Sequence, residues 1–104
     1  MAATIEDPII KKIAQASTEE DLISNTGETC ELSLSLGLAN DGSGNATVAV
    51  WITDSSGNHQ YPLLPDTVLA AKKAISNGAK LTLAGGGKIR VSASSTDVYA
   101  MICP

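Results

Sequence analysis

The sequence is poor in the residues that most often build active sites and large cores. Its 104 residues include no Phe, one Trp, two Tyr, one His and two Cys. With so few rings, the core has to be built from Leu, Ile, Val and Ala. No paired carboxylates, nucleophile with a base, or cluster of metal ligands stands out. The sequence therefore predicts a protein that is not an enzyme and that holds neither a cofactor nor a metal.

Charge is also scarce. Charged residues make up 17% of the chain and the formal net charge is −4. This balance argues against a nucleic-acid partner, because phosphates require a basic face. The first residues lack the basic start and long apolar stretch of a secretory signal, and no run is long enough to span a bilayer. We expect a protein made in the cytoplasm, with no membrane partner.

Short segments with alternating apolar and polar residues dominate the chain from Glu28 onward. The clearest are residues 31–36, 47–52, 80–83, 88–91 and 97–102. A period of two indicates strands, since successive strand side chains point to opposite faces. Several such strands at close spacing predict an all-β fold. We expect one domain, an antiparallel β-sandwich of the jelly-roll or immunoglobulin-like type.

The first 16 residues differ from the remaining 17–104, which we assign to the sandwich. Asp7 and Pro8 suit the N-cap and first position of a helix that would contain Ile9, Ile10 and Ile13. The three β-branched Ile residues favour instead an extended arm or a first strand over residues 9–16. An apolar arm would suit docking on a neighbouring molecule.

Clusters of Gly, Asn, Asp and Ser predict the turns. They occupy residues 25–27, 40–45, 54–58, 76–78 and 94–96. Three glycines at 85–87 predict a hairpin between strands 80–83 and 88–93, because a phosphate loop would require a following helix. Residues 66–75 fit either a helix or a strand.

The two cysteines leave two alternatives. Cys30 opens one predicted strand and Cys103 ends the last one. A disulfide would require these strands to adjoin with suitable geometry. Two free thiols in or near the core are the favoured interpretation, because free Cys often packs as a small apolar residue.

Alternation leaves three large side chains on the face opposite the aliphatic core. If Val48, Val50 and Ile52 point inward, Trp51 points outward, and Tyr99 and Met101 do so on the last strand. Such residues are enriched at protein interfaces. Together with the three isoleucines of the proposed apolar arm, these residues make up the predicted contact set. The set is Ile9, Ile10, Ile13, Trp51, Tyr99 and Met101.

The order of several segments carries a family resemblance. These segments are residues 13–16, 22–27, Asn40, 47–52, 77–81 and 87–91. In sequence they resemble a class of small β-sandwich structural proteins of tailed bacteriophages, over nearly the whole chain. That class usually has a Gly-Asp turn in its last hairpin, where this chain has Ser-Ala-Ser-Ser at 92–95.

The resemblance implies a virion component without enzymatic activity. We expect a head decoration or cement protein, made in the host cytoplasm, that bridges subunits of the capsid shell and forms a homo-oligomer. Its partners would be the major capsid protein or neck and tail proteins. The alternative is a neck, tail or tail-fibre module that binds a glycan receptor through Trp51, Tyr61 and the loop at 40–45.

Overall fold

The structure, a computed structural model, describes residues 9–103 apart from the side chain of Ala79. The expected role of Asp7 and Pro8 at a helix start lies outside this range, as does the part of the proposed arm before Ile9. The described residues form strands and no helix, which confirms the all-β prediction. The strands are β1 Ile9–Lys12, β2 Glu20–Ser24, β3 Cys30–Asn40, β4 Ala46–Thr53, β5 His59–Leu69, β6 Ala74–Leu83, β7 Lys88–Ala93 and β8 Val98–Cys103.

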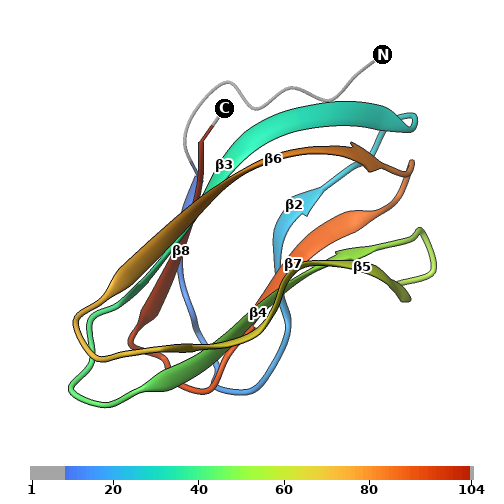
Figure 1. Cartoon of the computed structure of the whole chain (residues 1–104). Coiled ribbons are helices and arrows are strands. Elements are labelled where there is room, and N and C mark those ends of the chain that lie inside the picture. The colour runs from blue at the N-terminus through green and yellow to red at the C-terminus, as the bar shows by residue number, and fades with distance from the viewer. Residues whose placement is uncertain (1–8, 104) are drawn as a thin grey trace.

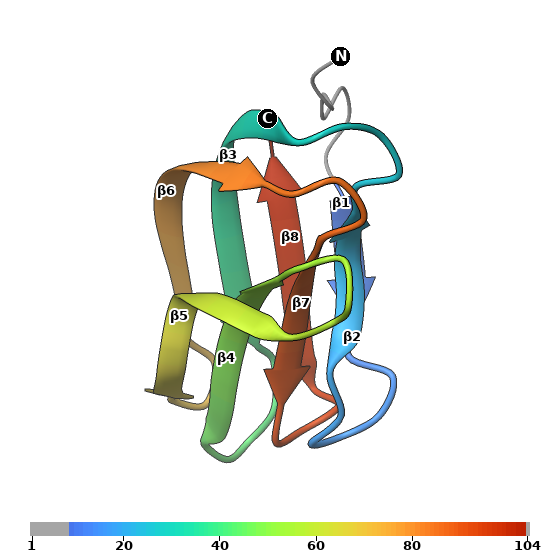
Figure 2. The same ribbon diagram turned by 90° about the vertical axis from the view of Figure 1, so that its right-hand side faces the viewer.

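The eight strands form two packed antiparallel sheets (Figure 1). One sheet has the order β1-β8-β3-β6 and the other β2-β7-β4-β5, and the two layers lie one behind the other in Figure 2. Every connection except that between β4 and β5 crosses from one sheet to the other. The chain thus pairs β1 with β8, β2 with β7, β3 with β6 and β4 with β5. This is the arrangement of a jelly roll, and it decides between the two predicted sandwich types.

The core lies between the sheets and is aliphatic, as the lack of aromatic residues predicted. Alternation fixes which side chains enter it, and the predicted inner faces are confirmed. Those buried residues are Leu32, Leu34, Leu36, Val48, Val50, Ile52, Val98, Ala100 and Ile102. Because both sheets contribute branched aliphatic side chains, the layers interlock without large rings.

The first strand is shorter than predicted. It ends at Lys12, so an unbroken strand over residues 9–16 is wrong. Ile13 turns inward and is 1% exposed, and its backbone N–H donates to the Val98 carbonyl at 2.9 Å. The backbone N–H of Ala14 donates to the Glu20 carboxylate at 3.0 Å. Burial of Ile13 in the core outweighs continuation of the strand, and residues 13–19 close this side of the sandwich.

Residues 66–75 form no helix, and both ends of this range lie in strands. Strand β5 continues to Leu69, and a turn at residues 70–73, with Lys72 at a φ of 58°, leads into β6. The predicted turn at residues 76–78 is wrong, because these residues lie within β6 and pair with β3 residues 35–37. The long ladder between β6 and β3 overrides the local turn preference of Asn77 and Gly78.

The glycine-rich segment is a turn, but the predicted hairpin around it is wrong. β6 pairs with β3, whereas β7 pairs with β2 and β4, so residues 84–87 cross between the sheets. The backbone packs tightly here. A Cβ on Gly87 would lie 2.6 Å from the Thr53 carbonyl oxygen, and one on Gly85 would lie 2.8 Å from the Gly27 carbonyl oxygen. Glycine is needed for close approach to neighbouring backbone.

Both cysteines are free, as favoured from the sequence. Their strands do adjoin, but Cys103 is opposite Ser35 in the β3–β8 ladder, five positions from Cys30. Five residues along a strand span about 16 Å. That separation is too large for a disulfide.

Candidate functional site

The outer face of the β1-β8-β3-β6 sheet brings together three large apolar side chains. Ile10 of β1 is opposite Met101 of β8, and Tyr99 follows on the same face. Their exposed fractions are 68%, 40% and 36%. These are three of the five large hydrophobic residues that are exposed in the described part of the chain. Half of the predicted contact set therefore forms one surface, which we call the outer patch.

Small residues next to the outer patch leave a shallow groove. Gly37 is opposite Met101 and Ala39 is opposite Tyr99 in the β3–β8 ladder, and β6 adds Ala74 and Ser76. The groove has a volume of about 310 Å³. A Cβ on Gly37 would lie 3.5 Å from Cε of Met101, an ordinary van der Waals distance, so the Met101 side chain lies directly over this position of β3.

The outer patch carries little charge. Lys12 lies at its rim, with its ammonium 5.9 Å from the centre of the Tyr99 ring. That distance is within the range of a cation–π contact, so the lysine covers part of the ring. An apolar surface with a polar rim is the usual composition of a protein contact site.

Ile9 and Ile13 do not belong to this surface. Ile9 is opposite the fully buried Ile102 and shares its inward side of the sheet. Ile13 is a core residue, as described above. Their assignment as contact residues is corrected here, because alternation in β1 and the turn that follows it direct both side chains toward the core.

Trp51 lies on the outer face of the other sheet, away from the outer patch. It is only partly exposed, because the His59 ring stacks on it with the ring centres 4.3 Å apart and an angle of 11° between the planes. His59 Nε2 also contacts the Glu19 carboxylate. This stacking occupies one face of the indole, which leaves less of it for a partner.

An ion-pair network extends from this stack across the outer face of the β2-β7-β4-β5 sheet. The Arg90 guanidinium is 3.5 Å from the Glu19 carboxylate and 2.9 Å from the Asp21 carboxylate. The Lys88 ammonium is 3.0 Å from the Asp21 carboxylate. Burial would raise the pKa of Asp21, but the hydrogen bond and charge of Lys88, together with Arg90, outweigh burial and lower it. The network ties β2 to β7 and contributes to the structure of this face.

The three parts of the alternative glycan platform are not assembled into one surface. Trp51 points outward, while Tyr61 lines a hollow with the inward-facing Ile52. Asn40 is 2% exposed, and its amide group donates to the carbonyls of Gly44 and Leu69 at 2.8 and 2.9 Å. Asn40 therefore holds its own loop in place.

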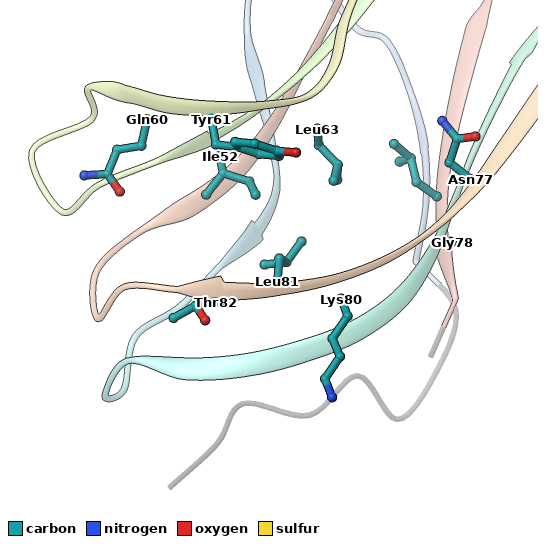
Figure 3. A pocket seen from close by; sticks show the side chains of 10 residues that line it. Ile52, Gln60, Tyr61, Leu63, Asn77, Gly78, Lys80, Leu81 and Thr82 are labelled. Atoms are coloured by element: carbon teal, nitrogen blue, oxygen red, sulfur yellow. The ribbon is translucent and has the colours of Figure 1, made fainter.

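A hollow between β5 and β6 was missed from the sequence. It has a volume of about 520 Å³, and the core residues Leu36 and Ile52 form part of its wall (Figure 3). Tyr61 and Leu63 of β5 and Leu81 of β6 project toward it, whereas Lys80 and Thr82 point away. The alternation of Tyr61 with Leu63 was the sequence signal, because it puts both side chains on one face of a strand. The predicted turn at residues 76–78 obscured β6, which forms the other wall of the hollow.

Within residues 9–103 no three or more His, Cys, Asp or Glu side chains are grouped as metal ligands would be. The same residues include no helix that is long and apolar enough to cross a membrane. Comparison with known sequences identifies no matching family model and no matching curated protein.

Proposed function

We propose that this chain is a non-enzymatic structural protein of a bacteriophage particle, and specifically a head decoration protein that bridges subunits of the capsid shell. The order of its sequence segments, which resembles that of small phage β-sandwich proteins, supports the class of protein. The outer patch supports the mode of attachment, and it is the observation on which the proposal depends. The jelly roll itself occurs in both capsid and lectin domains, so it does not choose between them.

The outer patch suits attachment that is weak at each site and repeated over a shell. Burial of the exposed parts of Ile10, Tyr99 and Met101 is worth about 2–4 kcal/mol, by the usual transfer values for such side chains. This energy alone gives weak binding. A subunit or oligomer that contacts several shell positions at once gains further affinity from the linkage of its sites.

Binding to particles that lack this chain tests the proposal. Particles are purified from the phage or induced lysogen that encodes the chain, after deletion of its gene, and the purified protein is added before sedimentation. The test variant is Met101→Asp, which places a charge in the outer patch. The control is Val68→Asp, which changes a 65% exposed side chain on the other sheet.

We expect the wild type and Val68→Asp to sediment with the particles and Met101→Asp to remain in the supernatant. Thermal unfolding of each variant shows whether it is folded. If Met101→Asp is folded and sediments as the wild type does, the outer patch is not the attachment surface. If the wild type itself fails to bind, the assignment to the virion is wrong.

A further inference from the structure

Four strands lie at the edges of the two sheets, and three of them carry features that prevent further pairing. Edge strands expose unpaired backbone groups and are normally protected by shortness, charge, proline or bulges. β1 has four residues, including Lys11 and Lys12. β2 has five residues, with two acidic side chains and a bulge between Asp21 and Ile23. β5 contains two prolines, and its ladder with β4 shifts register three times.

The fourth edge strand, β6, has none of these features except one lysine. It has ten residues, no proline, and a single charged residue, Lys80, which points to the outer face. Its ladder with β3 runs without interruption from Cys30 opposite Leu83 to Ala39 opposite Ala74. A long and regular edge of this kind is a template for another strand.

The space beside β6 is also open, in contrast to the opposite side of the sandwich. Between β1 and β2, Ile13 enters the core and Lys11 is 3.5 Å from Glu20. Between β5 and β6 the hollow remains, and Tyr61 at its rim is 60% exposed. Leu63 and Leu81 are only partly buried there. An added strand would therefore gain both backbone hydrogen bonds and apolar burial.

We propose that β6 pairs antiparallel with β6 of a second copy of this chain, in a register centred on Gly78. In this register Ile75 of each copy is opposite Leu81 of the other on the inner face. Lys80 is opposite Ser76 on the outer face. Moving the centre to Lys80 would place the two lysines opposite each other, and like charges in that position are destabilising.

In the register centred on Gly78, β6 is self-complementary, because Ile75 faces Leu81 and its one charged residue faces a serine. A two-fold axis at Gly78 joins the two β1-β8-β3-β6 sheets into one continuous sheet. The partner's Ile75 and Leu81 then lie beside the hollow, close to Tyr61 and Leu63 of β5. This interface uses the edge of the sheet and is independent of the proposed attachment to a virion.

Disulfide trapping tests the register. Gly78→Cys is made in a Cys103→Ser background, which leaves the buried Cys30 as the other thiol. The position tolerates a side chain, because a Cβ on Gly78 meets no atom within 4 Å. Two cysteines directly opposite each other have the Cα separation that a disulfide requires. The control is Lys80→Cys in the same background, whose two copies would lie about 13 Å apart.

We expect mild oxidation to convert Gly78→Cys to a covalent dimer on a non-reducing gel, while Lys80→Cys stays monomeric. A mixture of Ser76→Cys and Lys80→Cys proteins should give a mixed dimer. Sedimentation equilibrium of the wild type should show a dimer that dissociates on dilution. A wild type that is monomeric at every concentration would overturn the proposal, as would equal trapping of Gly78→Cys and Lys80→Cys.

Discussion

The buried side chain of Asn25 joins two turns at one end of the sandwich, and its removal should be costly. Its amide group donates to the carbonyls of Glu28, Leu83 and Ala84 at 2.8, 3.2 and 3.1 Å. Its side-chain oxygen accepts from the backbone N–H of Gly27 at 3.0 Å. The residue is only 3% exposed. Water therefore cannot readily replace all of these bonds after substitution.

Asn25→Ala removes the amide and leaves the buried Leu83 carbonyl without this donor, at a cost of about 1–3 kcal/mol. The other bonds are less buried and add about 1 kcal/mol together. We expect a loss of about 2–4 kcal/mol in the free energy of unfolding. For a domain of this size that lowers Tm by roughly 10–20 °C.

Urea and thermal unfolding followed by circular dichroism measure this loss. Asn45→Ala is the matched control, because Asn45 is exposed on a loop. Its substitution should change stability by less than about 0.5 kcal/mol. If the two variants lose equal stability, or if Asn25→Ala loses less than about 0.5 kcal/mol, the buried amide does not hold the turns together.

Three further results are expected. Gly87→Ala should destabilise the fold by about 1–3 kcal/mol, because the added Cβ would meet a backbone carbonyl of β4. Gly44→Ala is the control and should leave the stability unchanged, because a Cβ there meets no atom within 4 Å; chemical denaturation compares the two variants. The pKa of Asp21 is lower in the folded than in the unfolded state, so the contribution of its carboxylate to the free energy of unfolding is present above about pH 4 and is lost as the pH falls further. Asp21→Asn should therefore weaken the dependence of Tm on acid pH. In thiol labelling, the half-buried Cys103 should react in the folded protein and Cys30 only on unfolding, and rapid reaction of both would contradict the buried position of Cys30.

The faces of individual strands could be predicted because alternation is a local property of the sequence. Leu32 and Leu34 alternate with exposed Glu31 and Ser33, and the same logic placed Tyr99 and Met101 outward. The convergence of Ile10 with them could not be predicted in this way. It depends on the pairing of β1 with β8, which brings residues 9–12 beside residues 99–102.

The errors arose where long-range pairing overrides local preference. Asn77 and Gly78 are turn formers, yet they lie in a strand because β3 provides a partner for every residue of 74–83. The glycines at 85–87 predicted a turn correctly, but the sequence does not show whether a tight turn returns to the same sheet. In this jelly roll it crosses to the other one. A separate crossing, at residues 70–73, puts β5 and β6 in different sheets, on either side of the hollow.

If this chain is a phage decoration protein, as proposed, immunogold electron microscopy should locate it on phage particles produced by its source. An antibody raised against the purified protein is applied to intact virions, with particles from a deletion of the gene as the control. A decoration protein predicts gold over the whole head surface. Gold restricted to the neck or tail would contradict the decoration role, and absence of gold from every particle would contradict the assignment to the virion.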